Sequence, residues 1–208
     1  MSSKGSGGVD LVLMRHGEPQ RNDVNSRDPG LSDVGWAQVR RTLPYLMGGG
    51  PLAAIYSSPQ IRARQSAGVV ADSFGLAPAL DDGLVEFDHG APYVHYDDGS
   101  ASVWQSYFAG DLSPWGLTLA EFHGRIRDVM TRIADRHEGG RVLAVCHGGV
   151  VNAWTCQILG MPDRIRVMEP GYASLHRYRR VEGRWRIVSL NEIAPSLSTL
   201  NYSSARVI

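Results

Sequence analysis

The sequence has little of what would assign it to a specialised class of proteins. It contains one lysine among 21 basic residues and only two cysteines. Cys146 lies in an apolar strand pattern and Cys156 in a helix pattern, so we expect two reduced thiols in the core rather than a disulfide. This cysteine content is typical of a cytoplasmic protein, which is the location we expect.

Long hydrophobic runs and an excess of one charge are also missing. No apolar stretch approaches the length of a membrane span, and residues 1–9 lack the hydrophobic segment of a signal peptide. The formal net charge is zero, so no overall electrostatic attraction to nucleic acid or membranes is expected. We therefore predict no nucleic acid and no membrane as partners, and we leave a homodimer open as the assembly.

The histidines and cysteines form no metal-binding pattern. None of the seven histidines belongs to a His-x-x-x-His motif, and the two cysteines do not form Cys-x-x-Cys. The sequence accordingly predicts no metal site and no cofactor. Because nearly all basic residues are arginines, an anion site in this chain must be built from guanidinium groups and backbone amides.

Short apolar segments alternate with helical patterns along the chain. This alternation predicts βαβ units and a mainly parallel sheet covered on both faces, and therefore an α/β fold with a three-layer α/β/α sandwich. We expect five strands, near residues 10–15, 53–57, 142–147, 173–178 and 185–190. We expect four helices. The first is capped by Ser32, and the second begins at Ser58 with Pro59 in the first helical position. The third begins at a capping box of Thr118 and Glu121, and the fourth begins at Gly148.

One domain accounts for this pattern, because 208 residues with 43% apolar content form a sizeable core and no linker divides them. We expect residues 1–9 to be a flexible leader, 10–193 to form the domain and 194–208 to be a loosely held tail. Residues 81–124 hold eight acidic residues and no lysine or arginine, and six aromatic residues lie between positions 93 and 115. We interpret residues 81–124 as a cap over a functional site, with most of these aromatic side chains forming a small core of their own.

The triplet Arg15-His16-Gly17 follows an apolar strand pattern and is the most informative motif of the chain. Open α/β sheets bind ligands at the carboxyl ends of their strands. A histidine can attack a phosphoryl group while an arginine holds phosphate oxygens, and a glycine lets the backbone approach a bound group closely. The triplet alone is a weak signal, and by itself it would indicate a structural histidine.

Four further motifs and one asparagine follow the triplet in a fixed order. They are Asn22, Leu31-Ser32-Asp33-Val34-Gly35-Trp36-Ala37-Gln38, Ser57-Ser58-Pro59-Gln60-Ile61-Arg62-Ala63-Arg64-Gln65-Ser66-Ala67, Leu84-Val85-Glu86 and Val145-Cys146-His147-Gly148-Gly149. This ordered set resembles the histidine phosphatase superfamily, with its phosphoglycerate-mutase-like fold, and specifically the large branch with a glutamate proton donor. The resemblance extends from about Leu11 to Val150. It implies metal-independent hydrolysis of phosphomonoesters of small metabolites through a phosphohistidine intermediate.

The resemblance implies a role for each of five residues. His16 is the expected nucleophile, while Arg15, Arg62 and His147 are expected to hold the phosphoryl oxygens. Glu86 is the expected proton donor, and a covered, partly apolar pocket would raise its pKa. A backbone carbonyl near His16 would fix the tautomer of its ring.

A second group of residues is assigned with less support. Asn22 fits a position that contacts phosphate in the family. Gly148, at the start of a helix, lets the backbone approach a bound phosphate closely. Arg21 would lie either at the far end of the substrate or on the protein surface. The acid-phosphatase branch has an aspartate where this chain has Gly148, so the proton donor remains Glu86, with Asp88 and Glu18 as weaker candidates. The motif around Ser32 is interpreted as scaffold.

Two other functions stay open beside hydrolysis. A cofactor-dependent phosphoglycerate mutase, an isomerase, would carry basic residues after the glutamate and in the cap, whereas this chain has Phe87-Asp88-His89 and only 60 residues between Glu86 and His147. A non-catalytic phosphate-binding or scaffolding protein would have lost a catalytic group, and none is missing. An acidic, aromatic cap repels a second anionic group, so we expect a monophosphate with a neutral, partly apolar remainder.

Overall fold

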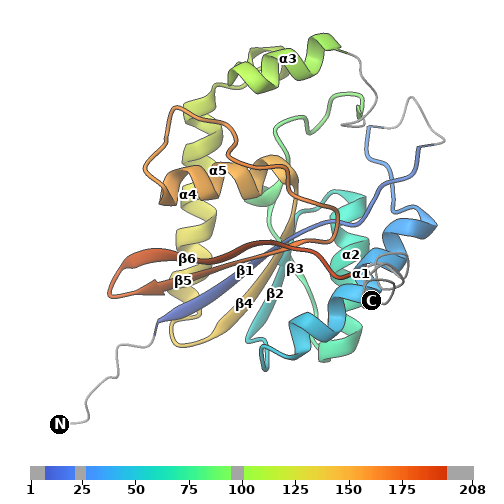
Figure 1. The fold of residues 1–208 in the computed structure, drawn as a ribbon, viewed down its shortest axis with the longest axis vertical. Coiled ribbons are helices and arrows are strands. Elements are labelled where there is room, and N and C mark those ends of the chain that lie inside the picture. The colour runs from blue at the N-terminus through green and yellow to red at the C-terminus, as the bar shows by residue number, and fades with distance from the viewer. Residues whose placement is uncertain (1–7, 22–26, 95–100, 196–208) are drawn as a thin grey trace, which may run out of the picture.

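A six-stranded sheet forms the centre of the computed structural model, which describes residues 8–21, 27–94 and 101–195 (Figure 1). The strands lie in the order β3-β2-β4-β1-β5-β6. They are β1 (Val9–Arg15), β2 (Ala54–Ser57), β3 (Ala79–Leu80), β4 (Arg141–Cys146), β5 (Leu175–Val181) and β6 (Arg184–Glu192). The first four are parallel, whereas β5 is antiparallel to β1 and to β6. The sheet is therefore mainly parallel, as predicted, with an antiparallel pair at one edge.

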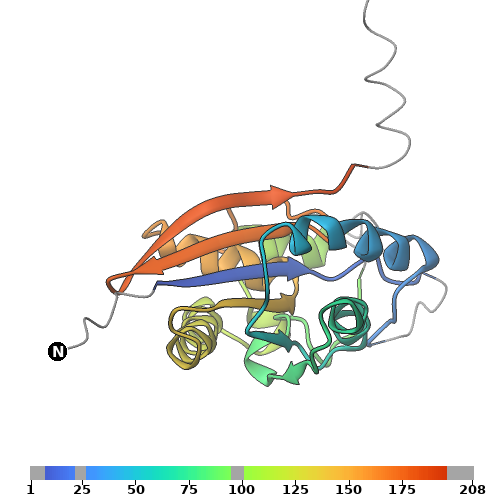
Figure 2. The same ribbon diagram turned by 90° about the horizontal axis from the view of Figure 1, so that it is seen from below.

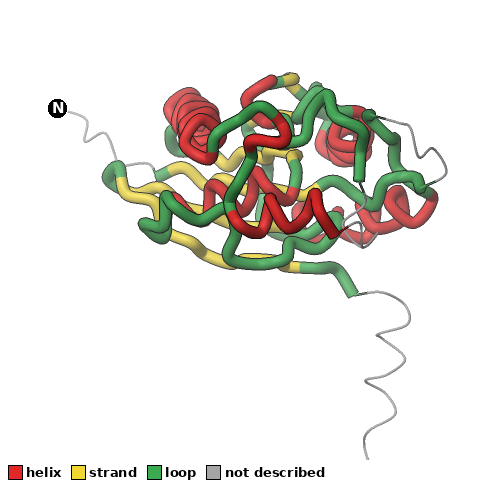
Figure 3. The backbone as a smooth tube through the Cα atoms, turned by 90° about the horizontal axis from the view of Figure 1, so that it is seen from above, coloured by secondary structure: helices red, strands yellow, loops and turns green. Residues whose placement is uncertain are grey.

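Helices cover both faces of this sheet (Figures 2 and 3). The helices are α1 (Asp33–Met47), α2 (Ile61–Phe74), α3 (Ala101–Ala109), α4 (Leu119–Arg136) and α5 (Gly148–Ile158). Alternate residues of β1 point to opposite faces: Leu11 and Leu13 pack with α4 and α5, whereas Val12 and Met14 pack with α1 and α2. This arrangement confirms the three-layer α/β/α sandwich.

Two element boundaries differ from the expectations. Helix α2 begins at Ile61 after an N-cap at Gln60, so the prediction that Ser58 caps this helix is wrong. The backbone amide of Ser58 still donates to the Val145 carbonyl oxygen (2.9 Å), which keeps this part of the chain extended beside β4. At the N-terminus, Val9 is the first residue of β1 rather than part of a leader. Strand β3 and helix α3 had no counterpart among the expected elements.

The motif around Ser32 does serve as scaffold. The Ser32 hydroxyl accepts from the Gly35 amide (3.0 Å) and caps α1, and Gln38 accepts from the Glu18 amide (2.8 Å). A Cβ atom on Gly35 would lie 2.1 Å from the Glu18 carbonyl oxygen, so only glycine allows the chain leaving β1 to pass this closely over α1. The start of α1 thus fixes the path of the segment that follows His16.

Aromatic side chains of residues 81–124 pack mainly against one another. The Phe87 ring stacks on Tyr107 at 4.7 Å between centroids and meets the edge of Trp115 at 4.8 Å. Trp104 in turn contacts Tyr107 and Phe108. These contacts agree with the expected small aromatic core; Tyr96 lies outside the described residues.

Helix α4 follows this aromatic cluster. It begins at the predicted capping box, in which Thr118 and Glu121 bond each other's backbone amides. No helix in the described part of the chain combines the length and apolar character that a bilayer crossing requires.

Candidate active site

Two histidines meet where neighbouring parallel strands end. His16 directly follows β1 and His147 directly follows β4, whose residue Cys146 is paired with Arg15 in the sheet. The two imidazole rings are 5.1 Å apart between centroids, and both histidines are buried. The strand-end location predicted for the triplet and for His147 therefore brings both rings into one site.

The His16 ring is held in one tautomer. Its Nδ1 lies 2.7 Å from the Gly17 carbonyl oxygen, which only accepts hydrogen bonds, so Nδ1 carries the proton and Nε2 keeps its lone pair. Burial, reinforced by the charges of Arg62 and Arg15, lowers the pKa of His16 well below the usual histidine value. The ring is thus neutral, as a nucleophile must be.

Arg62 points at this ring from the first turn of α2. Its Nε donates to His16 Nε2 at 3.2 Å, and the guanidinium lies over the Tyr93 ring at 4.6 Å from the centroid. Its Nη1 also contacts the Asp28 carboxylate at 3.3 Å. The arginine is 1% exposed, so its orientation is set by these contacts rather than by solvent.

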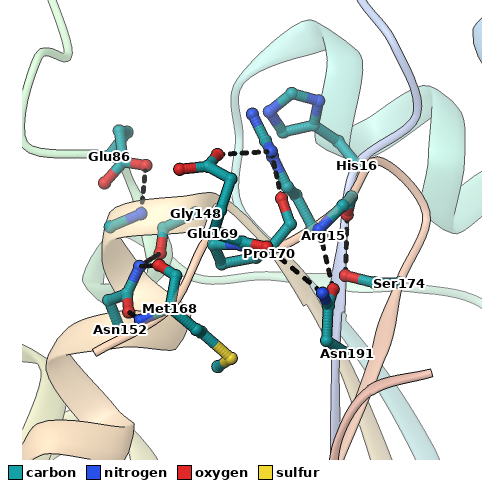
Figure 4. A network of polar contacts seen from close by, with 12 residues as sticks. Arg15, His16, Glu86, Gly148, Asn152, Met168, Glu169, Pro170, Ser174 and Asn191 are labelled. Atoms are coloured by element: carbon teal, nitrogen blue, oxygen red, sulfur yellow. Dashed lines mark hydrogen bonds and ion pairs between the residues drawn. The ribbon is translucent and has the colours of Figure 1, made fainter. Parts of the chain in front are cut away.

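Arg15 is held on the other side by the segment that leads into β5 (Figure 4). Its Nη1 donates to the Pro170 carbonyl oxygen and lies 3.7 Å from a Glu169 carboxylate oxygen. The guanidinium carbon is 4.1 Å from the centroid of the Tyr172 ring. Each of the two expected phosphate-binding arginines is therefore stacked on a tyrosine, which restricts its motion while leaving donor groups at its edge.

Asn152 and Asn191 anchor the segment that carries Glu169, Pro170 and Tyr172 (Figure 4). The Asn152 side chain accepts from the amides of Val167 and Met168 and donates to the Gly148 and Met168 carbonyl oxygens. Asn191 accepts from the Gly171 amide and donates to the Glu169 carbonyl oxygen. These contacts fix the wall of the site opposite α2.

The turn of residues 58–62 contacts three of the predicted site residues. The Ser58 hydroxyl lies 2.8 Å from His147 Nε2, the Gln60 side-chain oxygen accepts from the Glu86 amide at 2.8 Å, and Arg62 donates to His16. Neither Ser58 nor Gln60 was expected in the site, since their sequence had been interpreted as a helix start. The pattern Ser-Ser-Pro-Gln ahead of Arg62 was the available signal.

Glu86 lies against the start of α5 and is 8% exposed. One carboxylate oxygen accepts from the Gly149 amide (2.7 Å) and the other from the Phe87 amide (3.1 Å). Burial, followed by the charge of the neighbouring Asp88 carboxyl, raises the pKa of Glu86 to about 7, although the two amide bonds oppose the shift. The expected elevation of this pKa is confirmed in direction.

Gly149 and Gly68 offer a matched test of how Glu86 is placed. A Cβ atom on Gly149 would lie 2.3 Å from a Glu86 carboxylate oxygen and 2.8 Å from the Phe87 ring, whereas one on Gly68, in α2, would meet nothing within 4 Å. We expect Gly149→Ala to displace the carboxyl and lower kcat about 100-fold, the scale of losing a positioned acid. Gly68→Ala, outside the cavity, should stay within about threefold of wild type in the same assay. Equal kcat values for the two variants would contradict this account of the Glu86 position.

These groups surround one cavity of about 490 Å³, counting space open to solvent. Its lining includes five predicted site residues, Arg15, His16, Arg62, Glu86 and Gly148, together with Asp88, Tyr93, Trp104, Tyr107, Asn152 and Glu169. His147 lies beside His16 rather than in the lining. Arg21 is exposed and outside the lining, Glu18 contacts α1 through its backbone, and Asn22 lies outside the described residues.

Asp28 and Glu169 were not anticipated from the sequence. Both Asp28 carboxylate oxygens accept from the Ile61 amide, at 3.0 and 2.9 Å, so Asp28 caps α2 in place of a local side chain. The Ile61 amide at the start of this helix is therefore already bonded to Asp28. Among the described residues, no group of three or more histidine, cysteine or acidic side chains could hold a metal ion.

Comparisons with known proteins agree with this geometry. A family model described as histidine phosphatase superfamily (branch 1) matches residues 11–193. A bifunctional protein of Mycobacterium tuberculosis is 34% identical in an alignment of 148 residues that covers 66% of this chain and 40% of that protein, so the chain spans well under half of this relative. Phosphoserine phosphatase 1 of Hydrogenobacter thermophilus is 27% identical in an alignment of 168 residues that covers 74% of this chain and 77% of that one.

Among solved structures, a mycobacterial glucosyl-3-phosphoglycerate phosphatase has the same fold. The TM-score is 0.73 at 22% identity, with 88% of this chain and 99% of that chain covered. At this identity the similarity supports the fold alone. The match over residues 11–193 carries the assignment further: by family the chain is a histidine phosphatase, and it belongs to branch 1 of the histidine phosphatase superfamily.

Proposed function

We propose that the chain hydrolyses phosphomonoesters of small metabolites through a phosphohistidine on His16. The observation that carries this proposal is the neutral His16 ring, whose Nε2 faces Arg62 in a cavity that Glu86 also lines. Two buried donors nearby, Arg15 Nε and His147 Nδ1, have no hydrogen-bond partner among the described residues. Unpartnered buried donors are costly, and a bound phosphoryl group would satisfy them.

In the first step, His16 Nε2 attacks phosphorus and the bond from phosphorus to the ester oxygen breaks. Glu86 gives its proton to that oxygen, so a neutral alcohol leaves and Glu86 becomes a carboxylate. Arg15 and Arg62 stabilise the charge on the non-bridging oxygens. A pKa near 7 leaves a large fraction of Glu86 protonated at neutral pH.

In the second step, the Glu86 carboxylate takes a proton from water as the water oxygen attacks phosphorus. The bond from phosphorus to His16 breaks, inorganic phosphate is released, and both residues return to their starting states. No step needs a metal ion, because arginine and histidine side chains supply the charge stabilisation. Metal independence stays a prediction, tested by activity in excess chelator.

His147 is proposed to donate a hydrogen bond to the same phosphoryl group. The Ser58 hydroxyl accepts from the Gln60 amide (3.3 Å), and we propose that it donates its own proton to His147 Nε2 at 2.8 Å. That leaves the proton of the neutral imidazole on Nδ1, the atom without a partner among the described residues. Burial and the surrounding charges lower the pKa of His147 well below the usual value, which keeps the ring neutral.

Residues 81–124 are proposed to act as a cap of the domain formed by residues 10–193. This segment contributes Glu86, Asp88, Tyr93, Trp104 and Tyr107 to the cavity, whereas the sheet and its helices contribute the histidines and arginines. A cytoplasmic location and a homodimer remain predictions.

A panel assay separates hydrolysis from the mutase alternative. Arg15 and Arg62 are the only lysine or arginine side chains among the described residues that line the cavity, and the cavity also contains three acidic residues. A phosphoglycerate carboxylate would therefore be left unpaired beside like charges. We expect release of inorganic phosphate from monoesters, with and without chelator, and negligible interconversion of 2- and 3-phosphoglycerate in the presence of bisphosphoglycerate. Interconversion faster than hydrolysis would overturn the proposal.

The pH dependence of kcat should reflect the two shifted groups. Glu86 must be protonated to act as the acid, so kcat for an alkyl phosphate is expected to fall as the pH rises above about 7. His16 must be neutral, and its lowered pKa keeps it so down to pH values well below 6.5. The profile measured from pH 5 to 9 should therefore lose its alkaline limb in Glu86→Gln. An unchanged limb in that variant would assign the proton donor to another group.

A further inference from the structure

The part of the cavity beyond the phosphate-binding arginines is acidic. Asp88 lies two residues after Glu86, and its Oδ1 is buried with no hydrogen-bond partner among the described residues. Glu169 lines the same cavity, and its carboxylate lies 3.7 Å from Arg15 and is about half exposed (Figure 4). The two carboxyl groups belong to residues 81 positions apart in sequence, yet both residues line the same cavity.

The charges in this cavity do not balance once a phosphoryl group is bound. A dianionic phosphoryl group compensates Arg15 and Arg62, of which Arg62 also contacts the Asp28 carboxylate, so Asp88 and Glu169 have no further cation in the described lining. Two further arginines near the segment are engaged elsewhere: Arg125 donates to the Asp82 carbonyl oxygen, and Arg166 lies over the Phe108 ring. Neither lines the cavity. A bound ester therefore leaves the site short of positive charge.

Aromatic side chains complete this part of the cavity. Trp104 and Tyr107 line it beside Phe87, and their rings pack at about a right angle with centroids 5.8 Å apart. Aromatic faces together with carboxylates attract ammonium groups, the more so where water is partly excluded. A carboxylate on the substrate would meet the same surroundings as a repulsive partner.

We infer that the preferred substrates are phosphate esters of short amino alcohols, with a cationic ammonium group and no carboxylate, and that Glu169 is a specificity-determining residue for them. This inference rests on the proposed phosphatase activity. The ammonium group would lie among Glu169, Asp88 and the Trp104 ring while the phosphoryl group lies on Arg15 and Arg62. In this complex the ammonium group provides a counterion for the Asp88 and Glu169 carboxylates. An ester with a neutral or acidic alcohol provides none.

The test compares 2-aminoethyl phosphate with propyl phosphate, which has the same number of heavy atoms but no charge on the alcohol. Because the two leaving groups differ in intrinsic reactivity, the informative quantity is the ratio of their kcat/KM values in the wild type and in Glu169→Gln. We expect the substitution to reduce this ratio about tenfold, the scale of losing one partly desolvated cation contact. Glu138→Gln, at an exposed position outside the cavity, serves as the control and should leave the ratio unchanged.

Phosphoserine supplies the second arm, because it adds a carboxylate to the aminoethyl ester. We expect its kcat/KM in the wild type to be at least about tenfold below that of 2-aminoethyl phosphate. An unchanged ester ratio in Glu169→Gln, or phosphoserine as the better substrate, would overturn the inference while leaving phosphatase activity intact. If the wild type hydrolyses none of these esters and forms no phosphoenzyme, the proposed function itself fails.

Discussion

His16→Ala is expected to abolish turnover, lowering kcat by about 10⁴-fold or more, the scale seen when a covalent nucleophile is removed. The variant keeps Arg15, Arg62 and His147, so it should still bind phosphate esters, but it lacks the ring nitrogen that Arg62 contacts and that is the proposed nucleophile. The fold should persist, because the backbone bonds of His16 to Cys146 and Ala173 do not involve the ring. Circular dichroism and thermal unfolding check this point.

The direct measurement is the trapping of labelled phosphate on the protein by an alkaline, denaturing quench during turnover. Wild-type protein should carry an acid-labile, base-stable label, and His16→Ala should carry none. His137→Ala is a suitable control, because that ring contacts the Tyr56 hydroxyl (3.0 Å) and lies outside the cavity. Substantial turnover by His16→Ala, or a label that survives in it, would exclude the phosphohistidine mechanism.

Glu86→Gln is expected to lower kcat for alkyl phosphates by about 10² to 10⁴, the range for loss of a general acid. The amide oxygen of glutamine can still accept from Gly149, whereas its NH2 group cannot accept from Phe87, so the side chain keeps one of its two backbone bonds and loses its transferable proton. The loss should be much smaller for p-nitrophenyl phosphate, whose leaving group needs little protonation. This dependence on the leaving group distinguishes a missing acid from a general disturbance of the site.

Asp88→Asn tests whether Asp88, rather than Glu86, is the general acid. Asp88 is the second carboxyl in the cavity, and burial raises its pKa as well. If Glu86 is the acid, Asp88→Asn should keep the shallow wild-type dependence of kcat on leaving-group pKa, whereas Glu86→Gln should make this dependence steep. If Asp88→Asn selectively loses turnover of alkyl esters and Glu86→Gln does not, the general acid is Asp88 rather than Glu86.

Part of this site could be predicted because its signals are local. Arg15 and His16 directly follow one strand and His147 directly follows another, and parallel neighbouring strands end at the same edge of the sheet. The scaffold motif at Ser32 is equally local, since its cap and its glycine act within one turn of α1. The glutamate was placed by its order in the chain relative to these motifs.

Other contacts could not be predicted because they join segments that are far apart in sequence. Asp28 caps a helix that begins 33 residues later, and Glu169 approaches Arg15 from a segment more than 150 residues away. Ser58 was misassigned because a serine before a proline also fits a helix start, and only the pairing of its amide with β4 shows that the chain is still extended there. Nothing in composition or periodicity records such pairings.

The turn of residues 58–62 has a consequence for motion in the site. Through Ser58, Gln60 and Arg62 this one turn bonds to the proposed phosphate ligand, the proposed acid and the proposed nucleophile. When the outer layers of the molecule fluctuate, the reacting groups move with the turn as one body, and the distances among them change little. The distances among His16, His147 and Glu86 should accordingly be insensitive to loosening of the β5–β6 edge, and heat should separate these three groups only when the junction of β2 and α2 itself opens.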